Sequence, residues 1–234
     1  MLPRETIAGK EEDQMINSPD SKRYTPALRF HWLTHSYDWV LSRTMPEKAF
    51  KSALLSQASI APGHRVLDFG CGTGTLTLMA QSGAREAQVM GVDVDERALS
   101  IARAKAISAN SAVTFLKISS GPLPFEDHSF DRVLSCLVFH HLRRDEKLAA
   151  LAECRRVLRP SGEIHIADWG HPGSSILRAG FFLTQLLDGF ETTRDNVLGH
   201  MPALLSEAGF LDVVDTGHFP TVFGSLRLLR GTTR

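Results

Sequence analysis

The apolar positions of the chain fall into alternating runs that predict strands and helices in turn. Short continuous apolar runs are typical of buried strands, and segments whose apolar residues recur every three or four positions are typical of helices. The strands are predicted over 66–69, 88–92, 112–117, 129–136 and 163–168, and the helices over 46–59, 74–82, 96–108 and 143–158. Such alternation predicts an α/β fold, in which helices cover both faces of a parallel sheet.

The C-terminal part of the chain departs from this alternation. After a helix predicted over 201–208, two further strands are predicted over 210–215 and 222–229, with no room for a helix between them. Two strands joined so closely are expected to pair as a hairpin, because a parallel pair needs a longer crossover. The last strand is therefore expected to run antiparallel to the others.

The segment from about 170 to 196 is apolar around more than one helical face. A helix of this kind is either buried in the core or lines an apolar cavity. Because the segment follows the fifth strand, at the carboxyl edge of the sheet, we favour a lid over the substrate and name it the lid insert. A membrane-surface helix is the alternative, but Arg178 is the one basic residue of its apolar part, which argues against that.

The first 45 residues divide into a polar segment and an aromatic one. Residues 1–23 have little that could be buried and are predicted to be flexible. Residues 24–45 are too aromatic for a linker and predict a helical cap on the core, with Tyr37 facing a ligand site and orienting an acceptor there. His31 and His35 stand four apart, as metal ligands on a helix can, but no third ligand is in view, so no metal is expected.

Composition and charge narrow the class of protein. The 234 residues are 43% hydrophobic, which is enough for one large core, and the domain is predicted over 24–234. The formal net charge of zero argues against nucleic-acid binding, which needs a basic surface. The widely spaced Cys71, Cys136 and Cys154 form neither a metal pair nor a disulfide framework and fit a reducing cytoplasm. No apolar run approaches the roughly 18 residues that cross a bilayer, and no interface signature indicates an oligomer.

Three glycines follow the first predicted strand at every second position, in Asp68-Phe69-Gly70-Cys71-Gly72-Thr73-Gly74. Glycine lets the backbone approach a ligand closely, and the helix that follows adds a field favourable to negative charge. The dinucleotide fingerprint is G-x-G-x-x-G. Here the third glycine comes one residue early, which counts against a nicotinamide-dependent oxidoreductase. A plain tight turn without a ligand is the other alternative, but such a turn needs a single glycine.

Two acidic residues follow the second predicted strand. Asp93 lies nineteen residues after Gly74, which is about the spacing at which a carboxylate grips ribose hydroxyls. The alternative role for Asp93 or Asp95 is to cap the helix over 96–108. We assign the ribose to Asp93 and the helix cap to Asp95.

Four motifs together resemble the class I S-adenosylmethionine (SAM)-dependent methyltransferases, and most of all the ubiquinone/menaquinone-biosynthesis methyltransferases and their type-11 relatives. The motifs are Val66–Thr75, Gly91-Val92-Asp93, Leu123-Pro124-Phe125 with Ser129-Phe130-Asp131, and Val138-Phe139-His140-His141-Leu142. The resemblance implies a Rossmann-like three-layer αβα sandwich. Its seven-stranded, mostly parallel sheet would have the order 3-2-1-4-5-7-6, with the last strand antiparallel.

The resemblance also implies SAM as cofactor, with S-adenosylhomocysteine (SAH) as product, and a role for each position. The loop after the first strand would line the methionine and ribose of SAM through Asp68, Gly70, Cys71, Gly72, Thr73 and Gly74. Val94 would lie against the adenine, and the Leu137 backbone would accept from the methionine ammonium. Ser119 and Ser120 stand where the family usually has Asp-Ala. A neutral acceptor there contributes about 1 kcal/mol, against roughly 1.5–3 for an ionised one, so adenine binding is expected to be weaker.

Methyl transfer from a sulfonium needs alignment and a dry site, and a general base where the acceptor starts protonated. His140 and His141 are the candidate bases, because they follow the fourth strand at the ligand-binding edge and titrate near neutrality. The alternative is that one packs into the next helix and the other is solvated. His171 is a weaker candidate. The acceptor is expected to be a small, partly hydrophobic molecule, such as a quinone-like ring or a natural-product scaffold. The remaining alternative is a SAM-binding protein without catalytic activity.

Overall fold

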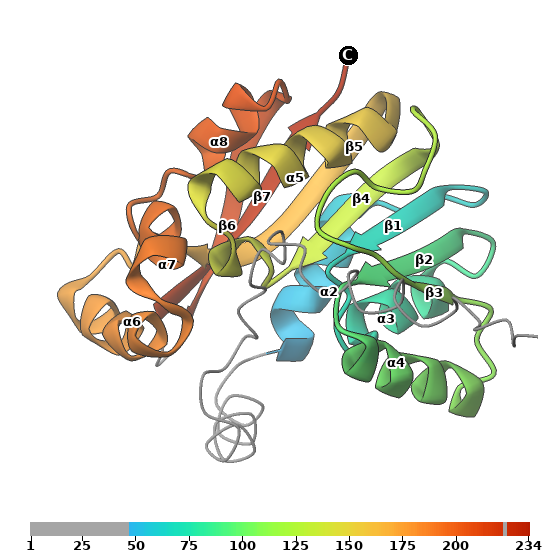
Figure 1. The fold of residues 1–234 in the computed structure, drawn as a ribbon, viewed down its shortest axis with the longest axis horizontal. Helices are drawn as coiled ribbons and strands as arrows, with labels where there is room; N and C mark the ends of the chain where they lie inside the picture. Colours follow the sequence, from blue (N-terminus) through green and yellow to red (C-terminus); the bar gives the residue numbers. More distant parts are fainter. Residues whose placement is uncertain (1–46, 222–223) are drawn as a thin grey trace, which may run out of the picture.

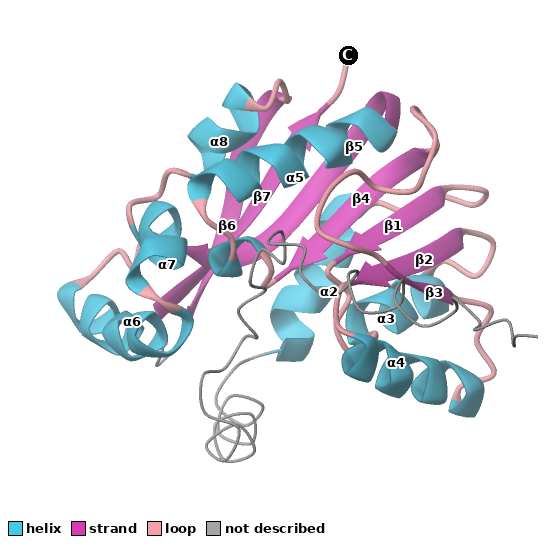
Figure 2. Ribbon diagram, in the orientation of Figure 1, coloured by secondary structure: helices cyan, strands magenta, loops and turns pink. Residues whose placement is uncertain are grey.

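The computed structural model describes residues 47–221 and 224–234 of the chain. These residues form three layers, in which helices lie on both sides of a central sheet (Figures 1 and 2). The predicted flexible segment 1–23, the predicted cap over 24–45 and its Tyr37 lie outside the described residues, as do His31 and His35.

The sheet has seven strands in the order β3-β2-β1-β4-β5-β7-β6, which confirms the order that the sequence implied. The strands are β1 (Arg65–Phe69), β2 (Gln88–Asp93), β3 (Thr114–Lys117), β4 (Phe130–Cys136), β5 (Leu158–Gly170), β6 (Leu211–Thr221) and β7 (Gly224–Thr232). Strands β1 to β5 pair in parallel, whereas β7 pairs antiparallel with both β5 and β6. The predicted hairpin and the antiparallel last strand are therefore confirmed.

Each face of the sheet has its own apolar core, because a separate set of helices packs on each face. On one face lie α2 (Glu47–Ala58), α3 (Thr75–Gly83) and α4 (Glu96–Ser108); on the other lie α5 (Arg144–Val157) and α8 (Met201–Glu207) (Figure 1). Phe50 and Leu54 belong to the first core, and Leu151, Cys154 and Leu204 belong to the second. All five side chains are fully buried.

The two largest differences from the predicted boundaries are in β5 and β6. Strand β5 begins at Leu158 and includes the predicted turn over 160–162, since Leu158 already pairs with Phe130 of β4. The turn survives as an irregularity, with Ser161 at a φ of 62° and a shift in the β4–β5 register. Strand β6 reaches Thr221, beyond the predicted end at 215, because the hairpin pairing continues to Gly224.

The lid insert consists of two helices, α6 (Ser175–Asp188) and α7 (Phe190–Val197), which meet at Gly189 with a φ of 102°. Its apolar residues divide between two environments. Phe181 of α6 is buried, with its ring 5.6 Å from that of Trp169 in an edge-to-face contact, whereas Phe182 is 55% exposed. Among the described residues, no helix is long and apolar enough to cross a membrane.

Candidate active site

The three glycines after β1 serve two different purposes. All have positive φ, at 72° for Gly70, 52° for Gly72 and 75° for Gly74. A Cβ atom at Gly70 would lie 2.4 Å from Val138, and one at Gly74 would lie 2.7 Å from Phe115, so both positions require glycine for packing. At Gly72, no described atom lies within 4 Å of the added Cβ. Gly72 is therefore the point where the loop borders open space and a ligand can approach.

Asp68 lies near the end of β1, and only one of its two carboxylate oxygens has a hydrogen-bond partner among the described residues. Thr77 donates to its Oδ2 at 2.6 Å, whereas Oδ1 is buried and has no hydrogen-bond partner among the described residues. Burial raises the pKa of Asp68 to about 6, and the bond from Thr77 opposes this shift. A buried acceptor without a donor is costly. A cationic ligand at Oδ1, such as an ammonium, would supply the donor.

The two aspartates after β2 have separate roles in the structure. Asp95 caps α4, since its Oδ1 accepts from the backbone nitrogen of Arg97 at 2.8 Å, as assigned from the sequence. Asp93 instead holds the glycine loop: its Oδ2 accepts from the backbone nitrogen of Gly72 at 2.7 Å. Its Oδ1 accepts from the backbone nitrogen of Asp95 at 2.9 Å. Each oxygen keeps a further lone pair, which is compatible with the predicted contact to ribose hydroxyls.

The remaining predicted cofactor residues lie at the same edge of the sheet. Cys71, within the glycine loop, is buried, and burial raises the pKa of its thiol. Val94 is half-buried after β2, and Ser119 and Ser120 are exposed after β3. Because the carboxyl ends of parallel strands meet at one edge, these positions line one rim.

Thr73 has a partner that sequence reasoning missed. Lys105 of α4 donates to Thr73 Oγ1 at 2.9 Å and to Thr75 Oγ1 at 3.2 Å. The lysine thus holds the C-terminal end of the glycine turn, on either side of Gly74, to the neighbouring helix. A lysine in a helix that is otherwise rich in charge gave no signal of this contact in the sequence.

The backbone after β4 makes an unusual turn at Leu137. Its φ is 59°, a left-handed value that costs a residue other than glycine about 1–3 kcal/mol. Its nitrogen donates to the carbonyl of Ala167 on β5 at 2.8 Å, which helps to hold the turn. The strained position is the one that the sequence assigned to the methionine ammonium.

The two candidate bases differ sharply in environment. His140 is 3% exposed, and its Nδ1 lies 2.7 Å from Asp168 Oδ1. His141 is exposed, and its ring centroid lies 3.9 Å from that of His140. Desolvation by the surrounding protein and the charge of His140 lower the pKa of His141.

Asp168 is the site residue that sequence reasoning missed. It lies two residues before the end of β5, at the same edge as Asp68 and Asp93, and besides His140 it accepts from the backbone nitrogen of Phe139 at 2.7 Å. The available signal was an acidic residue at the end of a third parallel strand. His171, the weaker candidate base, is exposed, and its Nδ1 accepts from the nitrogen of Gly173 at 3.2 Å.

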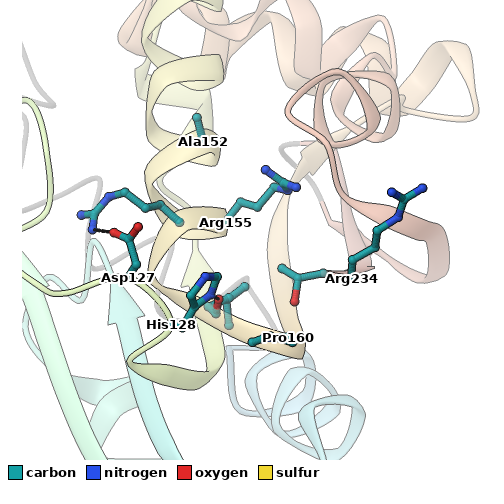
Figure 3. Close-up of a pocket in the computed structure, with 9 residues that line it drawn as sticks. Asp127, His128, Ala152, Arg155, Pro160 and Arg234 are labelled. Carbon is teal, nitrogen blue, oxygen red and sulfur yellow. Dashed lines mark hydrogen bonds and ion pairs between the residues drawn. The ribbon is translucent and has the colours of Figure 1, made fainter.

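Two hollows of the described surface lie away from the glycine loop. One, of about 370 Å³, lies at the amino end of β5, where Arg155 and Arg234 border it and Arg156 pairs with Asp127 at 2.7 Å (Figure 3). The other, of about 560 Å³, lies between α5 and α7. Neither is lined by residues of the glycine loop, so the candidate site rests on the loops at the carboxyl edge.

Comparisons with known proteins identify relatives of this chain. A family model described as a methyltransferase domain matches residues 66–162. A demethylmenaquinone methyltransferase of Symbiobacterium thermophilum is 30% identical over 172 residues, which cover 71% of this chain and 67% of that protein. A ubiquinone/menaquinone biosynthesis C-methyltransferase of Burkholderia multivorans is 30% identical over 60% of this chain and 58% of its own length.

Solved structures share the fold. A SAM-dependent methyltransferase from Aquifex aeolicus has a TM-score of 0.60 and 21% identity, over 83% of this chain and 93% of that one. A Haemonchus contortus phosphoethanolamine N-methyltransferase, in complex with SAH, has a TM-score of 0.67 and 17% identity, over 85% and 57%.

The sheet order and the glycine loop at its carboxyl edge define a Rossmann-like enzyme that uses a nucleoside cofactor. The matches make the class specific: the chain belongs to the SAM-dependent methyltransferase family.

Proposed function

We propose that this enzyme transfers the methyl group of SAM to a small, partly hydrophobic acceptor with a quinone-like ring. The observation that supports this most directly is the contact between two loops. Gly70 of the glycine loop packs on Val138, which belongs to the loop after β4 (residues 137–142, here the β4 loop). The β4 loop presents His140. A methyl donor on one loop and a base on the other would therefore be neighbours.

The described residues suit SAM in three places. The open space at Gly72 admits a ligand close to the backbone, and the unpaired Oδ1 of Asp68 suits the methionine ammonium. Asp93 retains lone pairs for the ribose hydroxyls. When bound, SAM supplies a methyl group that is already activated as a sulfonium. We assign the remaining contacts as the sequence implied, with Ser119 and Ser120 near the adenine.

The rest of the chemistry is alignment, exclusion of water and removal of a proton. We propose that His140 removes the proton, since it is buried and held by Asp168, whereas the lowered pKa of His141 makes that ring a weak base. We assign the lid insert, together with the segment 24–45 and its Tyr37, to covering the acceptor. The buried contact of Phe181 with Trp169 places α6 beside the residue that follows Asp168.

The proposed acceptor draws on the two curated relatives, which are named for demethylmenaquinone and for ubiquinone/menaquinone biosynthesis. No finding favours the alternative of a SAM-binding protein without catalysis. All three cysteines are free thiols, and we propose the reducing cytoplasm as the location.

The deciding experiment is a methyl-transfer assay with labelled SAM and a chemically reduced demethylmenaquinone that carries a short isoprenoid tail. We expect label in the ring product and none when the probe is left out. A panel of small phenols and amines, assayed in parallel, tests the acceptor class. Label on an amine and not on the reduced quinone would overturn the acceptor assignment.

A further inference from the structure

Asp168 gathers five hydrogen bonds around one buried carboxylate at the end of β5. Its Oδ1 lies 2.7 Å from His140 Nδ1 and accepts from the nitrogen of Trp169 at 2.7 Å. Its Oδ2 accepts from the nitrogen of Phe139 at 2.7 Å and, at 3.2 and 3.4 Å, from those of Val138 and His140. The carboxylate is 2% exposed, and charge-assisted bonds are strong where water is excluded.

This arrangement keeps Asp168 ionised. Burial is the largest influence and raises the pKa of Asp168, but the charge and hydrogen bond of His140, the bond from the Trp169 nitrogen and the charge of His141 together hold the pKa below its usual range. An ionised carboxylate can only accept, so the bond to His140 requires that Nδ1 carry the hydrogen. This assignment follows from the hydrogen-bond network. Nε2 is then the basic nitrogen of the neutral ring.

We propose that Asp168 is a positioning residue, which fixes the tautomer and orientation of His140 so that Nε2 takes the proton lost by the methyl acceptor. The inference rests on the proposed function and narrows the substrate class to acceptors that lose a proton, such as a hydroquinone. In a hydroquinone the O–H bond breaks, and the electron pair left on the acceptor, on oxygen or through the ring on carbon, forms the bond to the methyl carbon. Where carbon is methylated, the hydrogen on that carbon then passes as a proton to the oxygen and aromaticity is restored. The carbon–sulfur bond breaks with its pair on sulfur, giving SAH, and the proton ends on His140 as an imidazolium. The negative charge of Asp168 stabilises that imidazolium.

His141 does not share this environment, although it is the next residue. Among the described residues, no carboxylate forms a hydrogen bond or ion pair with its ring. Desolvation and the charge of His140 lower the pKa of His141, and the charge of Asp168 opposes that shift. The structure thus separates the roles of two histidines that the sequence treats alike.

The charged groups around the pair come from four elements of the described fold. Asp168 belongs to β5 and His141 to the short helix η1 (Phe139–His141). Lys147 of α5 lies within electrostatic reach of Asp168, and it pairs with Asp195 of α7 at 3.6 Å. Lys147 and Asp195 oppose each other in charge, so Asp168 is the net charge that these described elements place beside His140.

The first test uses the unsubstituted protein with ¹⁵N-labelled histidine. The His140 signals are assigned by their absence in His140→Gln. In mildly alkaline buffer, the nitrogen shifts are expected to show the tautomer with hydrogen on Nδ1 and a bare Nε2. The opposite tautomer would overturn the proposal, and the result does not depend on knowing the acceptor.

The second test is Asp168→Asn, which keeps the side-chain size and removes the charge. The midpoint of the His140 titration is expected to fall by about one pH unit, and the acid limb of kcat/KM to move down with it. With the reduced short-tailed demethylmenaquinone as probe, kcat is expected to fall about tenfold or more. Calorimetry with SAH checks that the cofactor site is intact. An unchanged titration of His140 in a folded variant contradicts the proposal.

A double-mutant cycle separates positioning from general structural support. If Asp168 acts through His140, then Asp168→Asn should cost little further kcat in a protein that already contains His140→Ala. Full additivity of the two losses would contradict the proposal. Asp131→Asn is the matched control: Asp131 accepts from Arg159 at 2.8 Å at the other end of the sheet, and its loss should leave the His140 titration unchanged.

The two proposals fail in distinguishable ways. A wild-type protein that binds SAH but methylates no probe overturns the proposed acceptor, while the tautomer measurement still decides the role of Asp168. An active enzyme whose His140 carries hydrogen on Nε2 overturns the role of Asp168 and leaves the proposed function in place.

Discussion

Gly70 packs so closely on Val138 that a Cβ atom at Gly70 would lie 2.4 Å from Val138 Cγ2. Gly70 belongs to the glycine loop and Val138 to the β4 loop, and the nitrogen of Val138 donates to Asp168. The loop assigned to the cofactor and the loop that presents His140 are thus joined by direct packing. Under the proposed function, this contact would also set the distance between methyl donor and base.

Gly70→Ala tests the contact between the two loops. We expect the free energy of unfolding to fall by about 2–4 kcal/mol, because overpacking costs about 1–3 kcal/mol and the positive φ costs about 1–2 more. Adding Val138→Ala removes the two nearest methyl groups and should recover about half of the loss. Urea unfolding measures both effects, with Val138→Ala alone as the control. A double variant no more stable than Gly70→Ala would show that the contact is not the cause.

Gly72→Ala tests the opening at the glycine loop. Gly72 and Gly63 both have positive φ, and a Cβ at either meets no described atom within 4 Å. Both substitutions should therefore cost a similar backbone strain of about 1–2 kcal/mol. Only the added methyl at Gly72 points to the proposed cofactor space, so we expect SAH affinity to fall at least several-fold there and to stay unchanged in Gly63→Ala. Calorimetry with SAH makes the comparison, and equal affinities would place the ligand elsewhere.

Much of the fold was predictable because its determinants are local. Apolar runs and helical periodicity marked β1 and α5 to within two residues of their observed bounds, and the absence of a helix before the last strand implied the hairpin. The glycine spacing indicated the cofactor loop without any knowledge of packing. It did not reveal that Gly70 packs on Val138 and Gly74 on Phe115, since those partners are distant in sequence.

The features that sequence reasoning missed depend on tertiary contacts. Asp168 is one acidic residue in the chain until the pairing of β4 with β5 brings it beneath His140. The left-handed turn at Leu137 has no glycine to mark it. The break of the lid insert at Gly189 was missed because the apolar residues that marked the segment lie almost entirely in α6, whereas α7 is mostly polar after Phe190.

Asp68→Asn tests the buried carboxyl whose pKa is raised to about 6. Between pH 4 and 6 the folded state binds more protons at Asp68 than the unfolded state, so the contribution of this group to stability falls as pH rises through that window. The total change is about 3 kcal/mol. Asparagine does not titrate, so the stability of the variant relative to wild type should rise over the same range in urea unfolding.

The same substitution should weaken cofactor binding. The SAH affinity of the wild type is expected to increase as pH rises through about 6, because the ionised Oδ1 of Asp68 attracts the methionine ammonium. Calorimetry at several pH values should show this increase in the wild type and its loss in Asp68→Asn. An affinity that stays constant in both proteins would remove Asp68 from the cofactor site.

Substitutions of Lys147 and Asp195 test how α7 is held against α5. Lys147 is fully buried, donates to the Thr192 carbonyl at 2.6 Å and lies 3.6 Å from Asp195. Desolvation lowers the pKa of Lys147, and Asp195 opposes that shift. Replacing a buried ion by an apolar chain of similar length often changes stability little. Removing its partner leaves a buried charge unpaired and costs about 3 kcal/mol or more.

We therefore expect Asp195→Ala to destabilise the protein far more than Lys147→Met in urea unfolding. In Lys147→Met, Asp195 keeps Arg144 at 3.2 Å and His200 at 3.5 Å, so its charge remains paired. In Asp195→Ala, the buried ammonium loses its carboxylate and should release a proton at lower pH. The destabilisation should then shrink as pH rises, because neutral Lys147 is less costly to bury. A larger loss in Lys147→Met would mean that the bond to Thr192, rather than the ion pair, holds α7 in place.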